Sequence, residues 1–269
     1  FIIKKALMQS EKVVNHIVNW LKDYAKNSSI NGFVTGISGG IDSAVTSTLC
    51  AQTNLPVLCL EMPIHQASSH ISRSQEHLLY LKRHYQNVSH YKVNLTPVFE
   101  AFKSEVSMDN ERVKVDMALA NTRARMRMLT LYYHASMFNY LVAGTGNKVE
   151  DFGVGFYTKY GDGGVDLSPI ADLLKSEVYE IGSYLGVPDS IMNAQPSDGL
   201  FGDARSDEDQ IGANYDELEW AMKMNDLNKT AADFSGREKQ VLQIFKNYNL
   251  KNQHKMTPIP VCKIPDNLK

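Results

Sequence analysis

The feature that most constrains the fold is a pair of adjacent glycines, Gly39-Gly40, set between an apolar strand and a helix. Residues 33–37 form a short apolar run, and residues 42–51 have apolar side chains at helical spacing. A strand that passes into a helix through a glycine turn is a building unit of α/β proteins, because the helix packs back across the sheet. The sequence therefore predicts an α/β fold around a parallel sheet.

The same alternation of strand and helix continues along the chain. Further helices are predicted over residues 10–26, 76–85 and 113–137, and further strands over residues 56–60, 91–94 and 140–143. This order predicts a doubly wound parallel sheet with helices on both faces, within a single domain of residues 1–269. Because right-handed crossovers place every strand-to-helix loop at one edge of such a sheet, we expect the chemistry in the loops that follow the strands.

Charge and cysteine content exclude several classes of protein. The 28 Lys and Arg residues nearly balance the 30 Asp and Glu residues, whereas a protein that binds nucleic acid needs a basic surface. No apolar run approaches the roughly 18 residues that span a bilayer. The three cysteines contain no Cys-x-x-Cys pair, so neither a disulfide framework nor a zinc site is expected. We expect a cytoplasmic protein that binds neither nucleic acid nor membrane.

The loop around the glycine pair has the composition of a phosphate-binding loop, Gly36-Ile37-Ser38-Gly39-Gly40-Ile41-Asp42-Ser43. The glycines let backbone N–H groups turn toward an anion, and the helix that follows contributes the positive end of its dipole. Ser38 and Ser43 can donate hydroxyl hydrogen bonds. Asp42 would repel phosphate directly, so an acid at this place suggests an intervening Mg2+. No Lys follows the glycines, so this is not a Walker A loop. The alternative interpretation is a plain glycine turn capped by Asp42.

The motif Ser38-Gly39-Gly40-Ile41-Asp42-Ser43 resembles the pyrophosphatase loop (PP-loop) of the adenine nucleotide alpha-hydrolase-like superfamily, whose fold is Rossmann-like. Members of that superfamily cleave ATP between its α- and β-phosphates. Further motifs make the chain similar to NAD synthetases: Gly144-Thr145-Gly146-Asn147-Lys148-Val149-Glu150, the loop Tyr157-Thr158-Lys159-Tyr160-Gly161-Asp162-Gly163-Gly164-Val165-Asp166, the helix 121–128, Pro196-Ser197 and His254-Lys255. This resemblance implies ATP-dependent amidation of deamido-NAD to NAD+ through an adenylated intermediate, with AMP and pyrophosphate released.

The resemblance also implies roles for individual residues. Asp42 and Glu150 are implied to be Mg2+ ligands. Lys175 is implied to stabilise charge on the phosphates, and Asp162 to hold or deprotonate the incoming ammonium. Thr145, Lys175 and Ser197 are implied to bind ATP together with residues 36–43. Contacts with deamido-NAD are implied for Arg125, Lys159, Asp166, His254 and Lys255. The segment from Glu150 to Lys159 is one residue longer than the spacing expected of the family.

Three arginines alternate along the helix predicted for residues 113–137, at Arg123, Arg125 and Arg127. Residues two apart on a helix are rotated by about 200°, so Arg125 is expected to point away from the other two. Since the resemblance assigns Arg125 to deamido-NAD, Arg123 and Arg127 are expected to be structural or to lie at an interface.

Three further expectations concern the nitrogen donor, the oligomeric state and the alternative functions. The chain begins at the helix before the loop strand, and no Cys has the setting of a nucleophile, so free ammonia is the expected donor. The family resemblance implies a homodimer, and apolar residues on the long helix are in line with one: Met126, Met128, Leu131, Tyr132 and Met137. The alternatives are another PP-loop adenylating amidotransferase or tRNA-modifying enzyme, and a non-catalytic module that binds adenine nucleotide.

Overall fold

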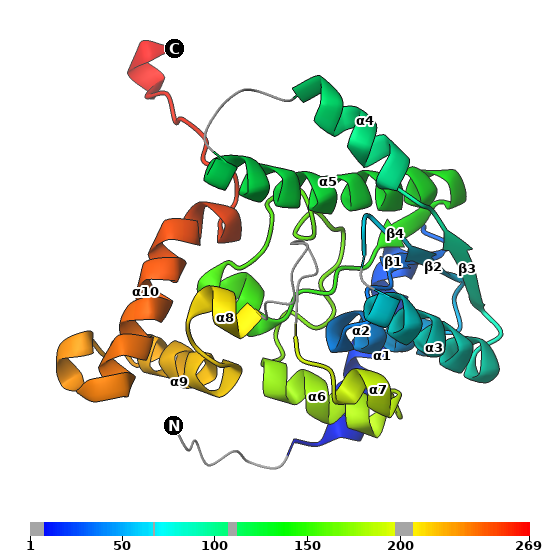
Figure 1. The fold of residues 1–269 in the computed structure, drawn as a ribbon, viewed down its shortest axis with the longest axis horizontal. Coiled ribbons are helices and arrows are strands. Elements are labelled where there is room, and N and C mark those ends of the chain that lie inside the picture. Colours follow the sequence, from blue (N-terminus) through cyan, green and yellow to red (C-terminus); the bar gives the residue numbers. More distant parts are fainter. Residues whose placement is uncertain (1–7, 67, 107–111, 197–206) are drawn as a thin grey trace.

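The computed structural model, which describes residues 8–66, 68–106, 112–196 and 207–269, contains a four-stranded parallel sheet flanked by helices (Figure 1). The strands are β1 (Gly32–Gly36), β2 (Val57–Glu61), β3 (Val88–Lys92) and β4 (Tyr140–Val142), in the order β3-β2-β1-β4. All three pairings are parallel, with Phe33 opposite Val57 and Leu141. The predicted parallel sheet is confirmed.

Helices cover both faces of this sheet, as the doubly wound prediction requires. Side chains that alternate along a strand point to opposite faces. Phe33 belongs to the core shared with α1 (Ser10–Asn27), α2 (Ile41–Gln52) and α6 (Lys175–Tyr184), and α3 (Ser68–His84) contributes to the same core. Its neighbour Val34 belongs to the core shared with α4 (Thr96–Val106) and α5 (Arg112–Phe138). Burial on both sides explains why the central strands are continuously apolar.

The strand order reverses between β1 and β4. From β1 the chain moves through β2 to the edge strand β3, and then returns by α4 and α5 to place β4 on the other side of β1. At such a switch point, adjacent loops leave the sheet in opposite directions and open a crevice at the carboxyl ends of the strands. The loops after β1 and β4 therefore flank the natural ligand site of this fold.

A separate group of helices follows the sheet in sequence and packs beside it (Figure 1). It contains the π-helix η1 (Val149–Val154), α8 (Asp207–Ile211), α9 (Tyr215–Asp226) and α10 (Gly236–Met256). Its core includes Val154, Leu218 and Phe245. The shorter elements are α7 (Asp189–Met192), η2 (Ala231–Asp233) and η3 (Asp266–Leu268). Among the helices that the structure describes, none is long and apolar enough to cross a membrane.

A π-helix lies at the start of the segment between Glu150 and Lys159. A π-helix closes its hydrogen bonds over five residues instead of four, so it holds one residue more than the corresponding α-helical turn. Val149–Val154 adopts this form, and Gly155 ends it with a positive φ of 62°. This form can accommodate a segment that is one residue longer than the expected spacing.

Two predicted boundaries are wrong. The helix predicted to begin at residue 76 begins at Ser68, because its polar first turns contact the glycine loop instead of the apolar core that sets helical periodicity. The predicted strand 91–94 is displaced to Val88–Lys92, an edge strand with little burial and so little apolar alternation.

Candidate active site

A cavity of about 250 Å³ opens at the switch point of the sheet. Its wall contains the whole of the glycine loop, residues 36–43, together with Thr145, Glu150, Asp162 and Lys175. Most residues with predicted roles in ATP binding and catalysis therefore surround one space. Ser197, which was also predicted to bind ATP, lies outside the described residues.

The glycine loop is built tightly against α3. Gly39 has a φ of +82°, and a Cβ added to it would lie 2.7 Å from the carbonyl oxygen of His70. Only glycine meets both conditions without strain. The Oγ atoms of Ser38 and Ser43 lie 3.0 Å apart, and the backbone N–H of Gly40 donates to Ser38 Oγ at 3.2 Å. The two hydroxyls thus lie together at the loop that opens α2.

Asp42 does not cap the turn. Its carboxylate accepts hydrogen bonds from Lys175 Nζ at 2.6 Å and from Asn147 Nδ2 at 3.2 Å. Gly40, at the N-cap of α2, carries no side chain that could cap the helix. The first N–H groups of α2 and its dipole are therefore directed to the cavity, which favours the phosphate interpretation over the capped turn.

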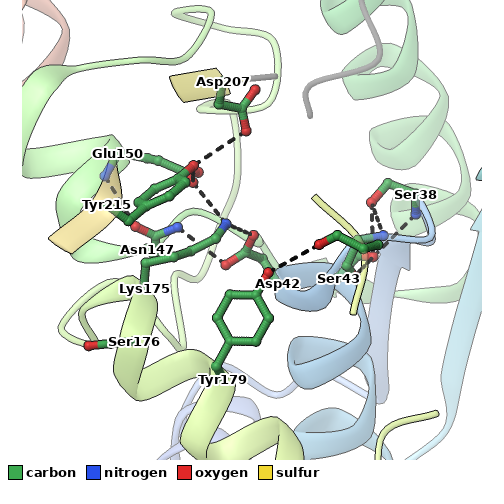
Figure 2. A network of polar contacts seen from close by, with 12 residues as sticks. Ser38, Asp42, Ser43, Asn147, Glu150, Lys175, Ser176, Tyr179, Asp207 and Tyr215 are labelled. Atoms are coloured by element: carbon green, nitrogen blue, oxygen red, sulfur yellow. Dashed lines mark hydrogen bonds and ion pairs between the residues drawn. The ribbon is translucent and has the colours of Figure 1, made fainter. Parts of the chain in front are cut away.

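Lys175 lies between two carboxylates from the loops on either side of the switch point (Figure 2). Its Nζ donates to Asp42 Oδ2 at 2.6 Å and to Glu150 Oε1 at 2.9 Å, and its side chain is 4% exposed. Burial alone would lower the pKa of Lys175, but the two carboxylates outweigh it and raise the pKa. Lys175 is therefore a fixed positive charge beside the phosphate loop.

Two further residues, which the sequence did not single out, hold this group in place (Figure 2). Asn147 is fully buried, and it donates to Asp42 while its Oδ1 accepts the backbone N–H of Glu150 at 3.1 Å. The hydroxyl of Tyr215 donates to Glu150 Oε1 at 2.5 Å. Asn147 belongs to the motif of residues 144–150, so its position in the sequence could have indicated a role in the site. Tyr215 lies on α9 and reaches the site only through tertiary packing.

Asp42 and Glu150 suit a Mg2+ ion that arrives with a nucleotide. Within residues 8–66, 68–106, 112–196 and 207–269, no group of three or more His, Cys, Asp or Glu side chains is placed to hold a metal ion. Mg2+ commonly binds through one or two carboxylates together with waters and substrate phosphates. The two carboxylates lie next to the phosphate loop and already share one positive charge, the Lys175 ammonium. The donor set therefore fits.

Two more acids line the same cavity. Asp162 lies on the cavity wall, and its Oδ1 accepts the backbone N–H of Thr158 at 2.9 Å. Loss of water around the carboxyl outweighs that hydrogen bond and raises the pKa of Asp162 to about 6.

Asp151, on the π-helix, lies against Gly146: a Cβ on this glycine would be 2.0 Å from Asp151 Oδ2. Burial and the nearby acids raise the pKa of Asp151 well above its usual range. No role was predicted for Asp151 from its sequence context.

Four of the five residues predicted to bind deamido-NAD gather around residues 155–160. Lys255 Nζ donates to the carbonyl oxygens of Gly155 and Tyr157 at 2.8 and 2.7 Å, and Lys159 Nζ donates to that of His254 at 2.6 Å. Arg125 donates to the carbonyl oxygen of Lys159. His254 and Lys255 lie in the last turn of α10.

Asp166, the fifth of these residues, has other partners. Its Oδ1 accepts the hydroxyl of Tyr132 at 3.0 Å, and its Oδ2 accepts the backbone N–H of Val142 at 2.8 Å. The predicted divergence of the arginines is confirmed: the Arg123 guanidinium lies 4.4 Å above the ring of Phe99, and Arg127 Nε donates to the Met62 carbonyl oxygen at 3.1 Å.

Comparison with known proteins supplies the family. The family model described as NAD synthase matches residues 13–259, well over half of the chain. The chain belongs to this family. A relative named NH(3)-dependent NAD(+) synthetase, from Carboxydothermus hydrogenoformans, is 38% identical over 169 residues, which are 63% of this chain and 65% of that protein. The matches span between about half and two thirds of the first curated relatives.

Solved structures of the NAD synthase family share the fold over nearly the whole chain. NMN synthetase from Francisella tularensis is 31% identical, with a TM-score of 0.82, and the match covers 97% of this chain and 100% of that one. The NH3-dependent NAD synthetase from Campylobacter jejuni is 26% identical, with a TM-score of 0.76, and the match covers 96% and 100%. The α/β Rossmann-like architecture is therefore that of the family.

Proposed function

We propose that this protein is a ligase that amidates deamido-NAD to NAD+ with ammonia, at the expense of ATP, through an adenylated intermediate. The observation that carries the proposal is the meeting of Asp42, Glu150 and Lys175 at the phosphate loop. A non-catalytic nucleotide-binding module would need the loop but not this buried triad of charges. The names of the curated relatives supply the ammonia and the NAD+ product.

The first step activates the nicotinate carboxylate, which is a poor electrophile. A carboxylate oxygen attacks the α-phosphorus of ATP, the bond from this phosphorus to the β-phosphate bridge breaks, and pyrophosphate leaves. Mg2+, held by Asp42 and Glu150 with the nucleotide, would neutralise charge on the phosphate oxygens. The loop N–H groups of residues 38–43 receive the diphosphate, Thr145 and Ser197 contact the nucleotide, and the Lys175 ammonium stabilises the charge that develops.

The second step is amidation of the mixed anhydride. Ammonium bound at Asp162 gives one proton to the carboxylate, and the resulting ammonia attacks the acyl carbon while AMP leaves with the bonding electrons. The nitrogen then loses a second proton to solvent, which gives the neutral amide. An acid with a pKa of about 6 suits this role, because it is ionised at neutral pH yet accepts a proton better than an ordinary aspartate.

The acceptor site is proposed to use Arg125, Lys159, His254, Lys255 and Asp166. The first four gather around residues 155–160, where three of them can carry positive charge toward a dinucleotide with two phosphates. A homodimer is also proposed.

The residues that support a dimer differ in part from those first expected. Met126, Leu131 and Tyr132 pack against the chain's own core. Met137 is exposed as expected, and the other exposed apolar side chains described on α5 are Val115, Met117, Leu129, Tyr133 and Phe138. A dimer would cover these side chains.

A second candidate is amidation of the mononucleotide, nicotinic acid mononucleotide, to NMN. The Francisella tularensis protein named NMN synthetase favours it, because it is more similar to this chain in identity and in TM-score than the Campylobacter jejuni enzyme. The activation and amidation steps would be the same, and only the acceptor would lose its adenylate half.

One assay separates these functions. Purified protein is mixed with ATP, Mg2+ and ammonium, and with deamido-NAD or nicotinic acid mononucleotide in parallel, and NAD+, NMN and AMP are quantified by chromatography. Formation of NAD+ with equimolar AMP supports the proposal, and preferential formation of NMN supports the second candidate. No amide with either acceptor would reject both and leave a binding module or a different adenylating enzyme. Glutamine in place of ammonium tests the nitrogen donor.

A further inference from the structure

Arg73 lies on α3, directly against the phosphate loop. Its Nε donates to the carbonyl oxygen of Gly39 at 3.1 Å. The contact is close because α3 is seated on this glycine: a Cβ on Gly39 would lie 3.1 Å from the backbone nitrogen of Ser74 and 3.2 Å from Arg73 Cβ. The guanidinium is therefore held at the loop by both backbone packing and a hydrogen bond.

Among the described residues, the terminal nitrogens of Arg73 have no hydrogen-bond acceptor. The bond to Gly39 is the only hydrogen bond or ion pair of this side chain to the part of the chain that the structure describes. The side chain is half-buried, and it lines the same cavity as Lys175 and residues 36–43. The guanidinium of Arg73 lies at a cavity and is not paired with a described carboxylate. Such a group can bind an anion that enters from solvent.

The cationic side chains of this site are otherwise engaged. Lys175 is bonded to two carboxylates, and Arg127 has a further interaction besides its bond to the Met62 carbonyl oxygen. The loop itself contains an acid and no Lys or Arg. Pyrophosphate gains negative charge as it leaves, and Arg73 can supply a balancing positive charge at the loop.

We propose that Arg73 binds the diphosphate portion of ATP, and the pyrophosphate that leaves, through its terminal nitrogens. The inference rests on the proposed function for the identity of the anion. It adds a binding residue on α3, in a region that the sequence did not connect with phosphate. A planar guanidinium can make two parallel hydrogen bonds to phosphate oxygens, which a lysine cannot.

The test is titration calorimetry with inorganic pyrophosphate and Mg2+. Arg73→Ala should raise the dissociation constant about 10- to 100-fold, the range for charged hydrogen bonds. Arg83→Ala removes an exposed arginine from the same helix and should leave binding unchanged. Arg73→Gln retains a donor for the Gly39 carbonyl oxygen but loses the charge, so its affinity for pyrophosphate should be lower as well. Circular dichroism checks that each variant is folded, and Arg73→Gln provides the test if Arg73→Ala does not fold.

Wild-type affinity in both Arg73 variants, or in Arg73→Gln alone, would overturn the inference, since Arg73 would then only hold the loop. No binding of pyrophosphate by the wild type would overturn it too. In the amidation assay, the KM for ATP should rise while the KM for deamido-NAD stays unchanged. A protein that binds pyrophosphate through Arg73 but forms no amide would refute the proposed function and leave this inference standing.

Discussion

Replacing Lys175 with Met removes the charge between Asp42 and Glu150 while keeping most of the side-chain volume. Two carboxylates, 18% and 17% exposed, would then lie together without their partner cation. Removing one member of a buried ion pair costs about 3–5 kcal/mol, because the charge left behind is neither hydrated nor paired. Since the two carboxylates touch a cavity that can admit water, we expect the lower end, about 3 kcal/mol at neutral pH.

Two conditions should reverse this loss in the Lys175→Met variant. The first is Mg2+, which can take the place of the missing ammonium: a ligand at 100 times its dissociation constant stabilises by about 2.7 kcal/mol. In the wild type the gain should be smaller, because Mg2+ competes with Lys175.

The second condition is low pH. In the wild type the pKa of Glu150 is lowered, since Lys175 and Tyr215 outweigh burial. The ionised Glu150 therefore contributes to the stability of the folded state. This contribution is present above 4.5, the pKa of Glu150 in the unfolded chain, and it is lost as the pH falls through the pKa of Glu150 in the folded protein. The unpaired carboxylates of the variant protonate more readily. The difference between the two proteins should therefore shrink on acidification.

Urea denaturation at pH 7 and pH 5, with and without Mg2+, measures these effects. Lys148→Met is the matched control, because Lys148 pairs with a 97% exposed Asp172. Its loss should cost less than about 1 kcal/mol. If Lys175→Met unfolds at the same urea concentration as the wild type, or if Mg2+ stabilises both proteins equally, the Lys175 ammonium does not stabilise the fold by pairing with Asp42 and Glu150.

Three other predictions follow from the same geometry. Asp42→Asn should fold but lose Mg2+ affinity and about two orders of magnitude of activity; Mg2+ titration with near wild-type affinity would remove Asp42 from the metal site. Gly146→Ala should cost about 1–3 kcal/mol, because its Cβ meets the Asp151 carboxylate. Asp151→Gly should recover most of that loss in a double-mutant cycle, and additive effects would contradict the contact. At saturating ammonium, kcat should fall on the acid side with a midpoint near pH 6, as Asp162 takes up its proton; a profile that stays flat through this pH would argue against Asp162 as the proton acceptor.

The parts of the site that were predictable follow from local pattern and sheet geometry. The apolar run before Gly39-Gly40 identifies β1 and its loop. The parallel sheet then brings the loops after β1 and β4 to one edge, where Asp42 and Glu150 meet. The burial of Lys175 was not predictable from pattern, since it has the spacing of a surface lysine at the start of a helix. Only the family resemblance singled it out.

The residues that the sequence missed depend on tertiary packing. Tyr215 reaches Glu150 because α9 packs beside the π-helix, a contact between residues 65 apart in sequence. Asp151 lies on the π-helix and contacts Gly146, which precedes this helix. A search for 3.6-residue periodicity does not detect a π-helix. Arg73 contacts the phosphate loop from the polar start of α3, where no apolar pattern marks a helix.

The central claim is that the loop at residues 38–43 receives the diphosphate when ATP is cleaved between its α- and β-phosphates. Phosphorus-31 NMR of the complete reaction mixture tests it directly. The account predicts resonances of AMP and pyrophosphate that grow in equal amounts and only when the nicotinate acceptor is present. Resonances of ADP and inorganic phosphate in their place would contradict it.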